Sequence, residues 1–137
     1  MQQRSFRLAP DRQQVLSGLV QELVDRKWVE AANGESEWSS PAFPVAKPGK
    51  PNEFRLVIDY RALNAVTKKD PFPMPNIEVM VERHAKTALL TIFDLSQAFH
   101  QVSLDEGSRD CTVFTDGKDL YRWKVMPMCI INAPARL

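Results

Sequence analysis

Asp94 is the side chain with the clearest capacity for chemistry in this sequence. It follows the apolar run ALLTIF over residues 88–93. The nearly continuous apolar segment 88–95 predicts a strand buried on both faces. An ionised carboxylate at the end of such a strand is costly unless it is paired or bound to a metal. Two interpretations stay open, a Mg²⁺ ligand of a phosphoryl-transfer site and an N-cap for the SQAFHQ segment, and the local pattern favours the cap.

A second candidate site is a basic segment between residues 47 and 69. It holds six lysines and arginines against two acids, a local charge of +4 in a chain whose formal net charge is +1. Lys47 and Lys50 flank a Pro-Gly turn, and Arg55 projects from the strand that follows it. This arrangement could grip phosphates. It could equally be a solvated hairpin surface, which on its own is the commoner case.

Other reactive residue types give weaker signals. Phe99, five residues after Asp94, could pack on a nucleotide sugar, although an aromatic here is more often core. Cys111 and Cys129 form no CxxC pair, which argues against structural zinc and predicts two reduced, buried thiols. No signal peptide and no membrane-length apolar stretch is visible. We therefore expect an intracellular chain without membrane contact, in cytoplasm or nucleus.

Periodicity predicts the elements that must position these residues. Apolar residues at three- and four-residue spacing predict a helix over 11–28. Residues 43–47 and 54–59 predict a strand pair joined by the turn 48–53. A short helical turn over 60–67, an extended proline-rich connector over 70–75, and a helix over 76–86 with Asn76 as its cap come next.

The remaining segments complete an α+β pattern. After the buried strand 88–95, residues 96–102 predict a turn or short helix. Residues 111–115 and 120–126 alternate like strands around the turn DGKD. Helix, hairpin, helix, strand and hairpin in this order predict an α+β fold with a mixed or antiparallel sheet and flanking helices.

Together these segments resemble one family, the reverse transcriptases. The carriers are SSPAFPVAKPGKPNEFRLVIDYRALNAVTKKDPFPMP, then LLTIFDLSQAFHQVSLDEGSRDCTVFT, then YRWKVMPMCIINAPARL. The His-Gln pair and the Asn-Ala-Pro ending are closest to long-terminal-repeat retrotransposons of the Ty3/gypsy type. The resemblance runs from about residue 12 to the last residue. It implies a tail over 1–11 and a partial domain over 12–137, with fingers over about 12–86, the start of the palm over about 87–137, and no thumb.

The resemblance also implies residue roles. Asp94 would be the catalytic carboxylate and Mg²⁺ ligand, with Mn²⁺ as an alternative metal. Lys47, Arg55, Phe99 and Met128 would bind the deoxynucleoside triphosphate, and Asp94 with Phe99 would lie beside the 43–59 hairpin. Arg61 and Asn64 would lie by the template strand or support the fingers. The partners implied are an RNA or DNA template-primer and the rest of a polyprotein (remaining palm, thumb, RNase H and integrase).

Two departures from the family pattern limit what the chain is expected to do. The Y-x-D-D hairpin that supplies two more aspartates is missing from these residues, and two-metal chemistry needs ligands on both ions. We therefore expect an RNA-directed DNA polymerase segment that is inactive by itself and exposes apolar surface. The alternatives are a non-catalytic retrotransposon remnant that binds nucleic acid and an unrelated α+β domain. Cys129 also replaces a glycine of the pattern, which is costly if that position needs a positive φ.

Overall fold

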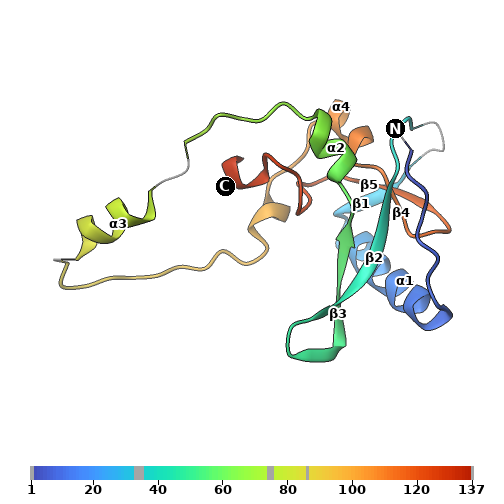
Figure 1. Cartoon of the computed structure of the whole chain (residues 1–137), viewed down its shortest axis with the longest axis horizontal. Coiled ribbons are helices and arrows are strands. Elements are labelled where there is room, and N and C mark those ends of the chain that lie inside the picture. The colour runs from blue at the N-terminus through green and yellow to red at the C-terminus, as the bar shows by residue number, and fades with distance from the viewer. Residues whose placement is uncertain (1, 33–35, 74–75, 86, 137) are drawn as a thin grey trace.

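A computed structural model describes residues 2–32, 36–73, 76–85 and 87–136. The elements in chain order are α1 (Pro10–Asp25), β1 (Val29–Ala31), β2 (Ser40–Lys47), β3 (Lys50–Ile58), α2 (Arg61–Val66), α3 (Ile77–His84), η1 (Ala98–Gln101), α4 (Glu106–Arg109), η2 (Asp110–Thr112), β4 (Phe114–Thr115), β5 (Leu120–Trp123) and η3 (Ala133–Arg136). Figure 1 shows a body formed by the sheet and α1, and a long excursion that carries α3.

The sheet has five strands in the order β1-β5-β4-β2-β3. The predicted hairpin is confirmed, since β2 and β3 pair antiparallel with a register shift between Ala46 and Lys47. The second predicted hairpin is confirmed with a shorter first strand, since Cys111 and Thr112 lie in η2, and Gly117 at φ 93° lies in its turn. Because β2 pairs β4 in parallel, the sheet is mixed. The sheet joins β1, β2 and β3 from the expected fingers segment (about 12–86) to β4 and β5 from the expected palm segment (about 87–137).

The core lies between α1 and the sheet. Leu16 and Val20 of α1 pack with Phe114 and Trp123 of the sheet in one buried cluster. The predicted helix over 11–28 is confirmed with a shorter C-terminal end, because the chain turns at Lys27, whose φ is 59°. α1 contacts β1, β2 and β3, so it fixes the first three strands against one another.

The predicted buried strand over 88–95 is wrong. This segment is neither helix nor strand, and together with the preceding residues it forms an arm that we define as residues 71–95 (Figure 1). Every described residue of the arm is exposed, and Ile92 is 92% and Phe93 86% exposed. A strand that is apolar on both faces needs cover on both faces, and the described residues give it none.

Helix α3 on the arm begins as predicted. The side chain of Asn76 accepts hydrogen bonds from the backbone N–H groups of Glu78 (2.9 Å) and Val79 (3.5 Å), so it is the predicted N-cap. Residues 71–73 are irregular, as expected of a proline-rich connector, whereas positions 74, 75 and 86 lie outside the described residues.

Two further expectations can be judged here. Both cysteines are free, but Cys111 is half-buried and Cys129 exposed, so the prediction of two buried thiols is wrong. Cys129 lies in a surface loop after Pro127, which explains its exposure. Among the described residues, the longest helices are too short or too polar to cross a bilayer.

Candidate nucleotide and nucleic-acid site

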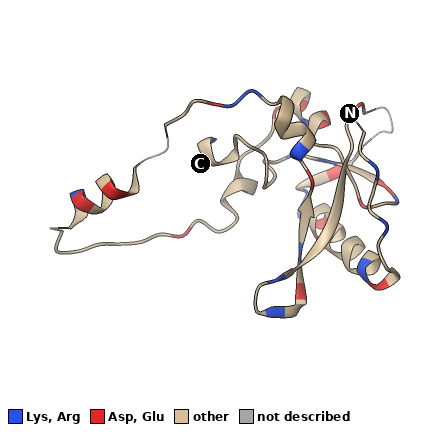
Figure 2. Cartoon of the chain, viewed as in Figure 1, with Lys and Arg blue, Asp and Glu red and all other residues tan. Residues whose placement is uncertain are grey.

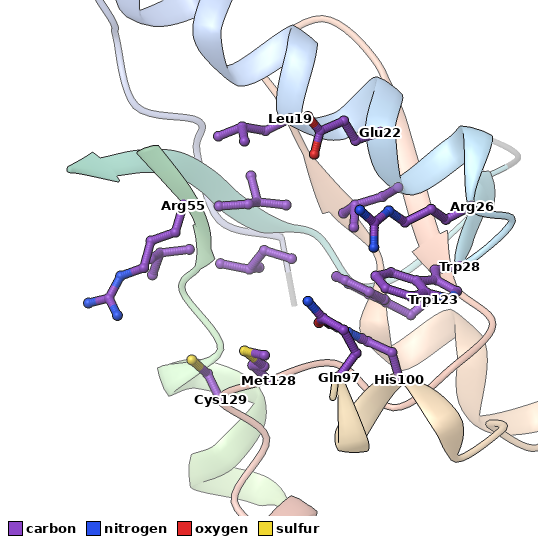
Figure 3. A pocket seen from close by; sticks show the side chains of 14 residues that line it. Leu19, Glu22, Arg26, Trp28, Arg55, Gln97, His100, Trp123, Met128 and Cys129 are labelled. Atoms are coloured by element: carbon purple, nitrogen blue, oxygen red, sulfur yellow. Dashed lines mark hydrogen bonds between the residues drawn. The ribbon is translucent and has the colours of Figure 1, made fainter. Parts of the chain in front are cut away.

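A cavity of about 220 Å³ opens between α1, β3, η1 and the loop after β5. Figure 3 shows Arg55 on one wall, Met128 and Cys129 on another, and Trp28, His100 and Trp123 at the far end. Of the residues predicted to bind the nucleotide, Arg55 and Met128 therefore lie together in the lining of this cavity. Its full lining is Leu19, Glu22, Leu23, Arg26, Trp28, Arg55, Leu56, Val57, Ile58, Gln97, His100, Trp123, Met128 and Cys129.

The β2–β3 hairpin carries positive charge at its tip, as Figure 2 shows. Lys47 Nζ and Lys50 Nζ both reach the carboxylate of Glu53, at 3.0 and 2.8 Å. Hydrogen bonds from Lys50 and Lys47 hold the pKa of Glu53 below its usual 4.5. All three side chains are about half exposed, so phosphates can reach both lysines. No ion pair joins Arg55, which is exposed, to another residue in the part of the chain that the structure describes.

Arg61 is held by Asp59 at the start of α2. Its Nε donates to Asp59 Oδ1 at 2.8 Å and its Nη2 to Oδ2 at 2.6 Å. The Arg61 hydrogen bonds lower the pKa of Asp59, whose side chain is only 9% exposed, whereas Arg61 is 87% exposed. This fork geometry orders the guanidinium, and its outer edge still faces solvent.

The loop after β5 has an unusual backbone at Cys129. Its φ is 72°, in the left-handed region that a glycine adopts without cost. This agrees with the expectation that the glycine replaced by Cys129 serves a positive φ. The side chain of Asn64, on α2, hydrogen-bonds to the backbone of this strained residue and to the amide two residues later, at Cys129 O and Ile131 N. Both atoms of the Asn64 amide are thus engaged within the protein.

The imidazole of His100 closes the far end of the cavity. It stacks between Trp28 (ring centroids 4.3 Å apart) and Trp123 (5.3 Å), and the guanidinium of Arg26 lies 4.9 Å from the Trp28 ring. Burial, and to a lesser extent the charge of Arg26, lowers the pKa of His100 below 6.5. A neutral imidazole is therefore favoured in this stack.

The structure does not bring Asp94 or Phe99 into the cavity that is lined by Arg55 of the 43–59 hairpin. Asp94 lies exposed on the arm, and Phe99 is half-buried at η1, and neither lines the cavity of Arg55 and Met128. The reason is the missing strand, since without cover the 88–95 segment cannot carry Asp94 to a sheet edge. No group of three or more histidine, cysteine or acidic residues in the described part of the chain could hold a metal. One exposed carboxylate does not satisfy Mg²⁺, which needs octahedral oxygen ligands.

Several residues in or near the cavity carried no signal in the sequence. Trp28 directly precedes Val29, which pairs with Trp123 in the antiparallel β1–β5 pair, although Trp28 and Trp123 lie 95 positions apart in the sequence. Asn132, in the Asn-Ala-Pro motif, bonds to the backbone of residues 68 and 70 and was given no role. Strand pairing brings the two tryptophans together and side-chain hydrogen bonds place Asn132, and a linear pattern contains neither contact.

Comparison with known proteins agrees with the resemblance. Residues 45–137 match the family described as reverse transcriptase (RNA-dependent DNA polymerase). The chain is 34% identical over 135 residues to the retrovirus-related Pol polyprotein from transposon 412 of Drosophila melanogaster, covering 96% of this chain and 11% of that protein. Identity is also 34%, over 137 residues, to the polyprotein from transposon 297 of the same organism, with 96% and 13% covered.

A plant virus provides a third relative. The enzymatic polyprotein of Cauliflower mosaic virus (strain NY8153) is 33% identical over 119 residues, covering 85% of this chain and 17% of that protein. The chain thus spans less than a fifth of the length of each of these relatives. Because transposon and viral polyproteins match with similar identity, the comparison does not single out the Ty3/gypsy type.

Proposed function

We propose, since the chain belongs to the reverse transcriptase (RNA-dependent DNA polymerase) family, that it is the fingers and first palm segment of a Ty3/gypsy-type polymerase. Its ancestral reaction is attack of a primer 3′-hydroxyl on the α-phosphate of a deoxynucleoside triphosphate. In this proposal, Arg55 and Lys47 meet the triphosphate, Met128 lies near the new base pair, and Arg61 lies near the template. The chain works within a larger intracellular polyprotein.

The observation that carries this proposal is the shared cavity of Arg55 and Met128. These residues lie 73 positions apart, and the fold brings them to one cavity beside the basic hairpin. A guanidinium suits planar, bidentate recognition of phosphate, and a cationic groove with aromatic rings suits nucleic acid. The Ty3/gypsy assignment is supported by His100-Gln101, by Asn132-Ala133-Pro134 and by the two Drosophila transposon relatives.

We also propose that these 137 residues alone do not extend a primer. Asp94 is a single exposed carboxylate, and the described residues do not fit a resident metal. Reverse transcriptases as a family use divalent metals, so the further ligands would have to come from other segments. A non-catalytic nucleic-acid-binding module is the second candidate function, favoured by this same isolation of Asp94.

Binding to a template-primer duplex tests the first proposal. Fluorescence anisotropy over a salt series should give weaker binding, and a salt slope smaller by about one per lost phosphate contact, for Lys47→Ala and Arg55→Ala. The matched control is Lys118→Ala in the β4–β5 turn, which removes the same charge away from the cavity. Equal losses in all three variants would contradict a specific site.

Primer extension tests the second proposal. The chain should incorporate no more nucleotide than its Asp94→Ala variant. Incorporation above that control would show that the segment is catalytic alone. Binding without incorporation is the result that both candidate functions share, and a longer polyprotein form that regains incorporation would favour the polymerase segment.

A further inference from the structure

Side-chain amides fasten the loop after β5 to α2. Asn64 Nδ2 donates to the carbonyl oxygen of Cys129 at 2.8 Å, and Asn64 Oδ1 accepts from the backbone N–H of Ile131 at 2.9 Å. The first bond holds the carbonyl of Cys129, the residue whose φ is 72°, and the second holds the amide two residues later. A left-handed backbone at a side-chain-bearing residue persists only where its surroundings hold it, and Asn64 supplies that hold.

Asn132, after this loop, makes the same kind of contact with the segment that follows α2. Asn132 Oδ1 accepts from the backbone N–H of Asp70 at 3.0 Å, and Asn132 Nδ2 donates to the carbonyl oxygen of Lys68 at 2.9 Å. Arg136 Nη2 adds an ion pair to Asp70 Oδ2 at 2.8 Å. Each asparagine thus hydrogen-bonds to one backbone N–H and one backbone carbonyl of the opposite segment.

This pattern requires a carboxamide. Asparagine and glutamine carry a donor and an acceptor on one planar group, whereas an ionised aspartate only accepts. An aspartate at 64 would turn an oxygen toward the Cys129 carbonyl, and an aspartate at 132 would do so toward the Lys68 carbonyl. Asn76 on α3 differs, because its side-chain oxygen only accepts hydrogen bonds, from the backbone N–H groups of Glu78 and Val79. An aspartate oxygen can accept the same two bonds.

We propose that Asn64 and Asn132 form a reciprocal amide clamp that fixes the 128–131 loop and so sets Met128 and Cys129 in the cavity wall opposite Arg55. This inference rests on the proposed function, which places the incoming nucleotide at that wall. The two asparagines are positioning residues, because neither lines the cavity. Of the two roles that the resemblance implied for Asn64, a place by the template strand or support of the fingers, this one is closer to the second.

The test compares three isotope-labelled variants with the unsubstituted 137-residue chain, using dATP as the ligand. Asn64→Asp and Asn132→Asp each remove a clamp donor with little change in size. Asn76→Asp is the matched control, with the same chemistry on the arm. NMR reports hydrogen exchange of the Ile131 and Asp70 amides, the Met128 methyl signal, and dATP affinity.

In Asn64→Asp and Asn132→Asp, exchange at the bonded amides should be about tenfold faster, as expected for loss of one such bond. The Met128 methyl signal should move, and dATP should bind about fivefold to tenfold more weakly. Asn76→Asp should change none of these. Unchanged exchange and an unmoved Met128 signal in both clamp variants would overturn the proposal.

Two further variants separate this role from general stability and from the proposed function. Tyr60→Phe loses the buried hydrogen bond from Tyr60 to the Thr112 carbonyl, 2.8 Å long, and leaves both asparagine amides in place. If it weakens dATP binding as much as Asn64→Asp does, the clamp is merely structural. Arg55→Ala should weaken dATP binding while leaving Ile131 exchange unchanged. A chain that binds no dATP would refute the nucleotide site, whereas the exchange rates still decide whether the clamp holds the loop.

Discussion

The imidazole of His100 lies parallel to the indole of Trp123, with an interplanar angle of 2° and ring centroids 5.3 Å apart. The second face of the imidazole is covered by Trp28. Burial lowers the pKa of His100 below 6.5, and the nearby charge of Arg26 acts in the same direction. Both causes disfavour the charged imidazolium in this stack.

Stability should therefore fall on acidification through His100. The unfolded chain takes up this proton more readily, so the contribution of the neutral imidazole is complete above pH 6.5 and is lost as the pH falls toward the lower folded pKa. Urea unfolding between about pH 7 and about pH 5 should show a steeper loss in the unsubstituted chain than in His100→Gln. His84→Gln is the control, and a loss that persists undiminished in His100→Gln would contradict this account.

Neutralising Glu53 should strengthen nucleic-acid binding. Its carboxylate engages both Lys47 and Lys50, and Glu53→Gln would free them for phosphates. We expect about fivefold tighter binding of a template-primer at low salt, decreasing as salt is raised. Glu78→Gln on α3 removes the same charge from the arm and should have a smaller effect. If the two variants gain equally, net charge rather than the hairpin explains the change.

Replacing Cys129 by glycine should stabilise the chain. A left-handed backbone costs a side-chain-bearing residue about 1–2 kcal/mol, and the added freedom of glycine in the unfolded state returns part of this gain. The expected net result is an increase of about 0.5–1 kcal/mol in the free energy of unfolding. Cys129→Ala keeps the strain and lacks the thiol, so it should stay within error of the parent. A stabilised alanine variant would point to the thiol instead of φ.

Polar substitutions on the arm should leave the folded body intact. Ile92 and Phe93 are 92% and 86% exposed, so Ile92→Ser and Phe93→Ser should change the unfolding free energy by less than about 0.5 kcal/mol. Phe114→Ala, at a position with no exposure, should cost about 3–5 kcal/mol. Binding of a hydrophobic dye should decrease in the two arm variants. A large stability loss in either of them would instead support the prediction of a buried strand over residues 88–95.

The sequence predicted α1, both hairpins and the Asn76 cap because each depends on neighbours a few positions away. Periodicity places Leu16 and Val20 on one face of a helix, and a Pro-Gly turn connects adjacent strands. The same kind of reasoning failed for 88–95, where local composition describes a strand but pairing and cover must come from elsewhere. Local propensity is overridden when its tertiary partners are lacking.

The candidate site was predictable in part. Arg55 and Met128 were named from the family resemblance, and they share a cavity. The stacked rings of Trp28, His100 and Trp123 were not foreseen, because strand pairing rather than spacing joins them. For Asn64 the resemblance implied a place by the template strand or a supporting role in the fingers, and its amide is occupied by the 129–131 backbone. A polar residue in a motif can equally well bind its own chain.

The arm also has a consequence for how this chain can fold and vary. The parallel pairing of β2 with β4 requires the chain to close a loop that includes the whole arm. The entropy cost of such closure rises only with the logarithm of length, by about 0.6 kcal/mol for each doubling. Shortening or lengthening the arm should therefore alter the closure cost little, so we expect the folded body to tolerate insertions and deletions there.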